Sequence, residues 1–458
     1  MKFNRNLIYI LSCLTLTVHA AEDGWKLQAS TLLSNDAFAT YRGVAPNVTG
    51  YLQRDCSFLP NHAMNLLDAI NAALCNNPQT RIAWANSLVA AGQLGSAQSA
   101  YLPTVNGTAN LSRDHSLLTG LNTTNRNLGL SLNYLLFDFG TRSAQRDAAL
   151  ATLDAANRNQ DLAVNNVYLA LVQAYYQYFA NQAQVVSLVA AEKSAKLSLD
   201  AASARYQAGT NTRADVLQAQ TAYTQAQLTR VRADGDMRVA QGVLSNAMGL
   251  NADTVLNLTP PTDDLTLKSL PDNVRDLITL AQQQRPDLLA ATAQLRAAQA
   301  QVRVNEAAGK PTLSLIGSTN YQDNGNISGT GNSIGLAVNA PLFTGFNNTY
   351  KIRTAQAQVS TQQAQQAQLN NQIALDVWRA WQNLATESAA LTASADLVAS
   401  ASASTELSLG RYRVGVGNML EVLNAQASLA SARTQQIQAQ YNLRIAKVAL
   451  AQAVGRLE

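Results

Sequence analysis

Two stretches of the chain carry a tyrosine, a glycine and a carboxylate in the same order and at the same spacing. They are Tyr206, Gly209 and Asp215 in the first stretch, and Tyr412, Gly415 and Glu421 in the second. A glycine just past a helix end tolerates the left-handed backbone of a tight turn. A carboxylate in the first turn of the next helix complements the helix dipole. The pattern predicts two helical hairpins in which each turn is followed by an acid.

The rest of the sequence offers few groups for catalysis. It has no phosphate-binding glycine loop, no metal-ligand spacing and no convincing Ser/His/Asp set. We therefore expect no enzymatic activity, no cofactor and no metal site. The net charge of +4 comes without a basic stripe interleaved with aromatic residues, so we expect no nucleic-acid partner.

The N-terminus has the features of an export signal. Lys2 and Arg5 precede an apolar run, and Val18-His19-Ala20 fits a cleavage site. We predict a signal peptide over residues 1–20 and a periplasmic N-terminal extension over 21–64. A lipidation site at Cys13 is an alternative, although the apolar run continues past that cysteine.

Two cysteines remain after removal of the signal peptide. Cys56 and Cys75 would meet an oxidising compartment, where an even pair most simply forms a disulfide. Two free buried thiols are the alternative.

The remaining chain contains one pattern twice, over residues 65–258 and 273–458, with a Pro-rich linker at 259–272. Each half predicts an initial helical region, a strand hairpin, a long helix and a shorter helix. The predicted bounds are 104–137, 140–207 and 213–249 in the first half, and 312–343, 346–413 and 418–455 in the second. Each long helix would span about 100 Å, which is too long for the core of a compact domain.

The last helix shows apolar and small residues in alternating steps of three and four, which predicts a coiled-coil seam. The seam residues are Leu420, Leu423, Ala427, Ala430, Thr434, Ile437, Tyr441, Arg444, Val448 and Ala451. No segment after the leader offers the roughly 18 apolar residues that a membrane helix needs. The strand hairpins alternate in polarity and are long enough to cross an outer membrane, although either one alone could be an ordinary soluble hairpin.

The chain resembles the TolC family of outer-membrane exit ducts. The likeness rests on the duplicated order of elements, on the Tyr-x-x-Gly turns with an acid downstream, and on Leu-Phe-Asp-Phe-Gly at residues 136–140. It implies a mostly α fold with a small β part and two internal repeats. It also implies a homotrimer in which each protomer gives four strands to a shared transmembrane β-barrel, continuous with a coiled-coil helical barrel.

The resemblance also implies a periplasmic gate at the glycine turns. Tyr412 matches a tyrosine that holds the inner helix pair closed, and Asp215 matches its acidic partner. Glu421 matches the first acid of a cation-attracting ring, whereas the second acid falls on Asn424 and the family's gate arginine falls on Gly417. These two departures put the depth of the negative ring and the strength of the latch in doubt.

The turns at Gly209, Gly415 and Gly417 are also the surfaces that such ducts present to a periplasmic adaptor. We therefore expect a passive conduit in the outer membrane, in contact with its lipid and served by an inner-membrane transporter and a periplasmic adaptor. Its task would be drug efflux or type I protein secretion, and the context of Cys75 is similar to that in protein-secreting members. The alternative is a soluble periplasmic coiled-coil adaptor or scaffold.

Overall fold

The computed structural model describes residues 63–115, 120, 122–261, 273–325 and 327–456. The predicted signal peptide, nearly all of the extension including Cys56, and most of the predicted linker lie outside these residues. Within the described part of the chain, no helix combines the length and the apolar character that crossing a membrane requires.

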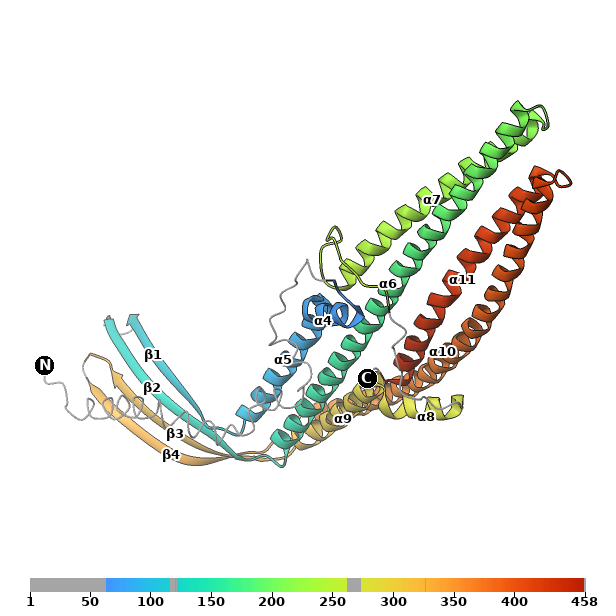
Figure 1. Cartoon of the computed structure of the whole chain (residues 1–458). Coiled ribbons are helices and arrows are strands. Elements are labelled where there is room, and N and C mark those ends of the chain that lie inside the picture. The colour runs from blue at the N-terminus through green and yellow to red at the C-terminus, as the bar shows by residue number, and fades with distance from the viewer. Residues whose placement is uncertain (1–62, 116–119, 121, 262–272, 326, 457–458) are drawn as a thin grey trace. The chain divides into compact units, whose positions relative to one another are not determined.

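The same order of elements occurs twice (Figure 1). The first repeat contains α4 (Leu66–Asn76), α5 (Pro78–Ser99), β1 (Thr104–His115), β2 (Asn122–Phe137), α6 (Thr141–Gln207) and α7 (Arg213–Ala247). The second contains α8 (Val274–Gln284), α9 (Pro286–Ala307), β3 (Thr312–Asp323), β4 (Ser328–Asn339), α10 (Asn347–Arg413) and α11 (Met419–Val454). The predicted mostly helical fold with a small sheet and two internal repeats is confirmed.

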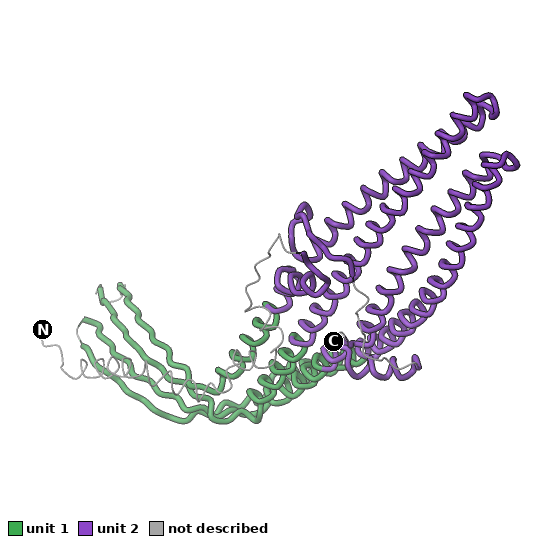
Figure 2. The backbone as a smooth tube through the Cα atoms, in the orientation of Figure 1, with its two compact units in different colours: residues 1–50, 85–156, 293–363 green, residues 51–84, 157–292, 364–458 purple. Residues whose placement is uncertain are grey.

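The chain forms two compact units, coloured separately in Figure 2. Unit 1 contains the four strands and the helical segments next to them, within Ala85–Ala156 and Ala293–Gln363. Unit 2 contains the described parts of Tyr51–Trp84, Asn157–Thr292 and Ala364–Glu458. Both glycine turns belong to unit 2.

The strands of unit 1 form one antiparallel sheet in the order β1-β2-β3-β4. The register aligns Leu132 with Val105 on one side and with Gly317 on the other, and Gly317 in turn with Ile334, so one face of the sheet is largely apolar. The opposite face carries polar rows such as Asn106, Ser131, Ser318 and Ser333. Apolar side chains that are exposed on the first face are Val105, Leu111, Leu128, Leu130, Ile334, Leu336 and Val338. Strands β1 and β4 form the two edges.

A buried ion pair fixes the passage from β2 into α6. The Arg142 Nε donates to Asp138 Oδ2 at 3.1 Å, and Arg142 Nη1 donates to the Leu135 carbonyl at 2.7 Å. The same carboxylate accepts the backbone N–H groups of Gly140 and Arg142. A buried charge is tolerated only with such partners. The Leu-Phe-Asp-Phe-Gly motif therefore supplies the acid that this corner needs.

The corner between β4 and α10 in the second repeat lacks this pair, because Thr344 and Asn348 stand in the equivalent positions. Its aromatic residues are exposed, with Phe343 at 78% and Phe346 at 66%.

An aromatic core lies in unit 2 where α4, α6 and α7 meet. Tyr175, Tyr176 and Phe179 of α6 pack with Leu244 and with the C-terminal residues of α7. The Tyr175 hydroxyl donates to the Thr259 carbonyl at 2.6 Å. Burial raises the pKa of Tyr175 to about 12, because the apolar surroundings disfavour the phenolate.

Alanine recurs every seventh residue along α7 and α11. The positions are Ala219, Ala226, Ala233, Ala240 and Ala247 in α7, and Ala425, Ala432, Ala439, Ala446 and Ala453 in α11. All five in α11 and three of the five in α7 are buried. Small side chains at a heptad position let helix backbones approach closely.

The predicted seam of α11 is met only in part. Its residues Val448 and Ala451 are buried, but Leu420, its first residue, is 51% exposed. Val422 and the alanine heptad that begins at Ala425 are buried instead over most of the helix.

Candidate functional site

The two glycine turns have the same backbone construction. In the first, the N–H of Gly209 donates to the Tyr206 carbonyl at 3.0 Å and that of Thr210 donates to the Arg205 carbonyl at 2.9 Å. In the second, Gly415 donates to Tyr412 at 3.2 Å and Val416 donates to Arg411 at 3.0 Å. This is the Schellman arrangement, and it needs a left-handed residue: φ is 73° at Gly209 and 82° at Gly415.

A polar residue caps the helix that leaves each turn. In the first turn, Thr212 and Asp215 form a reciprocal capping box, in which Asp215 Oδ2 accepts the Thr212 N–H at 3.1 Å. The same oxygen also accepts the Thr212 hydroxyl at 2.9 Å. In the second turn, Asn418 caps the Glu421 N–H at 2.8 Å. Satisfying these free N–H groups is what starts α7 and α11.

The side chain of Tyr412 connects the two turns. It is only 6% exposed, and its hydroxyl accepts a hydrogen bond from Asn211 Nδ2 at 2.9 Å. The Arg205 guanidinium lies 4.4 Å from the centre of its ring, and Arg205 Nη2 donates to the Arg413 carbonyl at 3.0 Å. Arg205 and Asn211 of the first turn therefore hold Tyr412 of the second.

The predicted partner of Tyr412, Asp215, lines the same cavity of about 490 Å³. The hydroxyl of Tyr412 bonds Asn211, however, while the Asp215 carboxylate bonds Thr212. Sequence reasoning missed Asn211, for which no motif exists. Arg205 was recoverable in principle, because an Arg-Tyr pair precedes both turns.

The predicted ring residues lie in the first turns of α11. Glu421 is partly exposed and Asn424 is exposed. Arg411 Nη2 lies 4.0 Å from Glu421 Oε2, and both side chains are about half in solvent, so this pair contributes about 0–1 kcal/mol.

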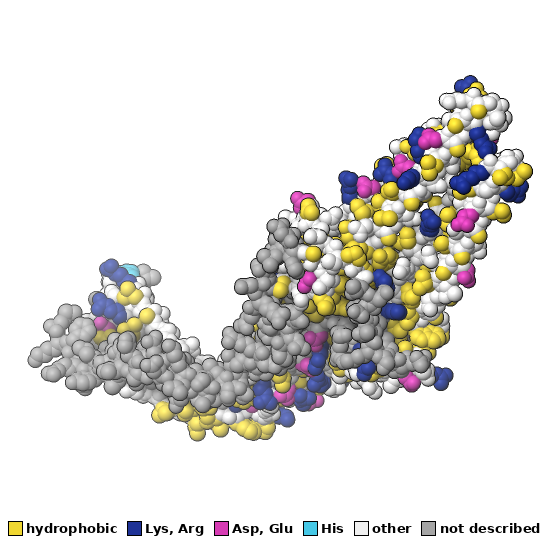
Figure 3. Space-filling model, viewed as in Figure 1, with side chains coloured by type: hydrophobic (Ala, Val, Ile, Leu, Met, Phe, Trp, Pro, Cys, Tyr) yellow, Lys and Arg dark blue, Asp and Glu magenta, His cyan; other side chains and the backbone are white. Residues whose placement is uncertain are grey.

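Gly417 occupies a position where a side chain would collide with the preceding helix end. An added Cβ would lie 3.0 Å from Arg411 Cβ and 3.1 Å from the Tyr412 nitrogen. Glycine thus stands where the resemblance implies an arginine, and it lets the backbone of the turn approach the end of α10 closely. The guanidinium groups near Tyr412 come from other positions. Figure 3 shows Lys and Arg side chains at the turn end of each helical hairpin.

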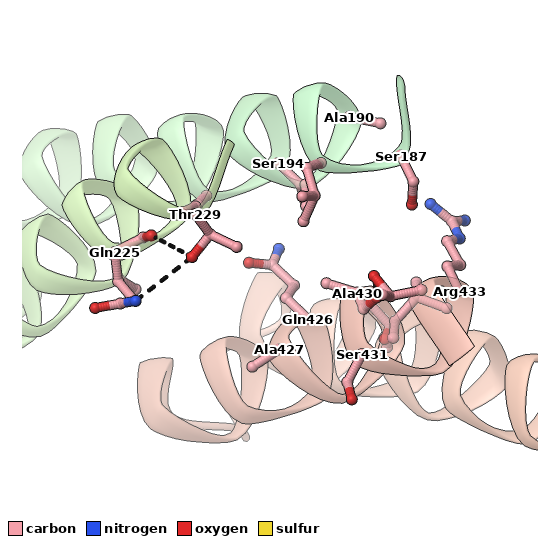
Figure 4. A pocket seen from close by; sticks show the side chains of 18 of the residues that line it. Ser187, Ala190, Ser194, Gln225, Thr229, Gln426, Ala427, Ala430, Ser431 and Arg433 are labelled. Carbon is pink, nitrogen blue, oxygen red and sulfur yellow. Dashed lines mark hydrogen bonds between the residues drawn. The ribbon is translucent and has the colours of Figure 1, made fainter. Parts of the chain in front are cut away.

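A second cavity, of about 470 Å³, lies between α6, α7 and α11 (Figure 4). Labelled lining residues include Ser187, Ser194, Gln225, Gln426 and Arg433. Its described lining is mostly apolar, from Ala and Leu side chains, with Ser, Thr and Gln between them, and it contains no paired acid and base. Among the described residues, no group of three His, Cys, Asp or Glu side chains could hold a metal ion.

Cys75 is buried and disulfide-bonded. Its predicted partner, Cys56, lies outside the described residues, so the pairing stays a prediction.

A repeated unit of helices, strand hairpin and long paired helices defines a class of outer-membrane channel architecture. The crystal structure of the outer membrane protein VceC from Vibrio cholerae has this fold. It matches with a TM-score of 0.76 and 22% sequence identity, over 85% of this chain and 96% of that one.

The family model described as "Outer membrane efflux protein" matches residues 69–250 and 277–456, and the chain belongs to this family. Protein CyaE of Bordetella pertussis is 33% identical over 86% of this chain and 84% of its own length. Outer membrane efflux protein BepC of Brucella suis is 28% identical over 86% and 85%, respectively. The protein is thus an outer-membrane exit duct with a large periplasmic helical part, and the alternative of a soluble periplasmic adaptor or scaffold is not supported.

Proposed function

We propose that three copies of the chain form one duct that takes substrate from an inner-membrane transporter and a periplasmic adaptor and releases it outside. The observation that carries the trimer is the sheet. Its order β1-β2-β3-β4 leaves a row of unpaired backbone groups on β1 and on β4. Lipid cannot satisfy such groups, so the edges must pair with strands of other copies. Three sheets of four strands give twelve, within the range of closed membrane sheets.

The two faces of the sheet support this environment. Exposed aliphatic residues such as Ile334 and Leu336, at 80% and 66%, suit contact with acyl chains. The Asn and Ser rows of the other face suit a water-filled lumen. An apolar surface of this size would otherwise be a liability in water.

The paired helices would continue as a periplasmic tunnel whose entrance is formed by the glycine turns. In this proposal Tyr412, Asp215, Glu421 and Asn424 belong to the gate. The turns at Gly209, Gly415 and Gly417 meet the adaptor. The cargo is either small toxic compounds or unfolded protein. The conduit performs no chemistry on it.

Planar-bilayer recording of the purified protein tests the proposal. We expect a trimer that conducts ions, and we expect Glu421→Gln to weaken block by divalent cations, because three carboxylates would leave the entrance of each trimer. Glu306→Gln, an exposed acid on α9, is the matched control and should leave the block unchanged. A sample that stays monomeric in lipid and passes no ions would exclude the duct.

A further inference from the structure

We propose that the cavity between α6, α7 and α11 is a binding site for an anionic amphiphile with a single apolar chain, such as a fatty-acid carboxylate. The apolar body of the cavity takes the chain, and Arg433 and Ser187 take the headgroup. The site shares no residue with the cavity at the glycine turns, and a single copy of the chain supplies its described lining. It therefore does not depend on the proposed function.

The cavity has the size and the length of a ligand site. Its volume of about 470 Å³ lies within the range of small-molecule pockets. Its lining extends over residues 184–195 of α6 and 423–435 of α11. At about 1.5 Å of helix per residue, the lined space is roughly 16–18 Å long. Such an elongated space suits one extended chain better than a compact molecule.

Most polar side chains along the body of the cavity already have hydrogen-bond partners within the protein. Gln225 Nε2 donates to Thr229 Oγ1 at 3.4 Å. Gln426 Nε2 donates to Ser198 Oγ at 3.0 Å, and the Thr405 hydroxyl bonds backbone carbonyls. With these bonds made, the alanine and leucine side chains set the character of the body. An apolar chain that enters it gains free energy by leaving water.

Two polar groups of the lining lack such partners. The Ser187 hydroxyl is buried and makes no hydrogen bond with the described residues. Arg433 is exposed and makes no hydrogen bond or ion pair with any residue that the structure describes. Figure 4 shows both at the same end of the cavity. A headgroup oxygen there would accept hydrogen bonds from both and remove the cost of the unpaired buried hydroxyl.

The charge of the lining selects an anion. Arg433 is the only charged residue of the described lining, which contains no Asp or Glu. The acid of α6 next in sequence to the cavity, Glu192, is already paired with Arg230. A guanidinium binds a carboxylate by charge-assisted, often bidentate hydrogen bonds. A cationic headgroup would instead meet a like charge at the solvent edge of the cavity.

Photolabelling of the whole protein in phosphatidylcholine nanodiscs tests the site. The probe is dodecanoate that carries a photoreactive diazirine, and labelled peptides are identified by mass spectrometry. We expect labels within residues 184–195 and 423–435, and unlabelled dodecanoate should suppress them. Dodecyltrimethylammonium, which has the same chain length and the opposite charge, should be about tenfold less effective as a competitor. Labelling of the lipid corrects for probe that enters the bilayer.

Substitutions in the headgroup end should weaken binding of the probe. Arg433→Gln should raise its half-saturating concentration about tenfold, and Ser187→Ala should raise it about two- to fivefold, as expected for a charged and a neutral hydrogen bond. The matched control is Arg379→Gln, which changes an exposed arginine of α10 outside the cavity and should leave binding unchanged.

Filling the body of the cavity should abolish the labels. Ala191→Leu combined with Ala430→Leu places two larger side chains in the space that the chain would occupy. Ala390→Leu, the same change at a partly buried alanine outside the cavity, should keep the labels.

Three results would overturn the assignment. They are labels that lie mainly outside the two segments, equal competition by dodecyltrimethylammonium, and unchanged affinity in Arg433→Gln. Because Arg433 is exposed, Arg433→Gln should keep the melting midpoint of the wild type. This variant therefore decides the outcome even if the filled variant does not fold.

Discussion

The two glycine turns share a backbone and differ in what their side chains do. Both close with the same pair of Schellman hydrogen bonds around a left-handed glycine. The first turn projects Arg205 and Asn211 toward its neighbour, whereas the second contributes the buried Tyr412. Duplication has kept the geometry that ends one helix and starts the next. The side chains can differ between the turns, since the hydrogen bonds that close each turn join backbone atoms only.

The strand-to-helix corners show the same division. The first is locked by the buried Asp138–Arg142 pair, which the second lacks, and both corners expose phenylalanines, the second more than the first. At the turns and at the corners alike, one repeat carries a side-chain interaction that the other repeat lacks.

Removing the ring of each tyrosine would test the comparison most strongly. We expect Tyr412→Ala to lower the local stability of the second turn by about 3–5 kcal/mol, because a buried aromatic side chain leaves a cavity. Tyr206→Ala should change the first turn by no more than about 0.5 kcal/mol, as is usual for exposed sites. Hydrogen exchange of the backbone amides around each turn measures both. Equal losses of stability in the two variants would mean that the difference in exposure between Tyr412 and Tyr206 does not affect the stability of the turns.

A methyl group at Gly417 should produce the next largest effect. Gly417→Ala would press a Cβ against Arg411 and Tyr412 at 3.0–3.1 Å and destabilise the turn by about 1–3 kcal/mol. Gly410→Ala is the control, since its Cβ meets nothing within 4 Å inside α10 and should stabilise the helix by about 0.5–1 kcal/mol. The same exchange experiment distinguishes them. A stable Gly417→Ala variant would show that the second turn has as much room as the first, which accommodates Asn211.

The smallest difference should come from the two acids. Asp215→Ala breaks a capping box and should weaken the start of α7 by about 1 kcal/mol. Glu421→Ala loses a helix-dipole interaction, a 3.3 Å hydrogen bond from Asn418 Nδ2 to Glu421 Oε1 and an exposed arginine 4.0 Å away, so about 0.3–1 kcal/mol is expected at the start of α11. Exchange rates of residues 213–216 and 419–422 report the two effects. A larger loss of stability at the start of α11 than at the start of α7 would mean that Glu421, and not Asp215, makes the stronger capping interaction.

Much of this architecture follows from the sequence because two of its signals are local. These are the spacing of apolar residues within a strand or helix, and the glycine and proline residues at which a helix ends. Alternating polarity gave the strands, and the absence of proline and internal glycine gave α6. The seam of α11 was predicted only in part because a row of alanines carries little hydrophobic contrast, although its seven-residue spacing is visible in the sequence. The Asn211–Tyr412 contact joins positions 201 residues apart, and no local pattern encodes such a pair. The resemblance paired Tyr412 with Asp215, whereas the structure joins the Tyr412 hydroxyl to Asn211.

The alanine rows of α7 and α11 have a consequence for how this protein tolerates change. At the eight buried alanines of these rows, a larger side chain such as valine would have to displace neighbouring atoms. Some residues between these positions are also buried, such as Leu244 in α7 and Val422 and Leu450 in α11, whereas the others are partly or fully exposed and less restrained. The paired helices can keep their packing through many substitutions at exposed positions. The positions that tolerate the least change include alanines, which are inconspicuous in the sequence.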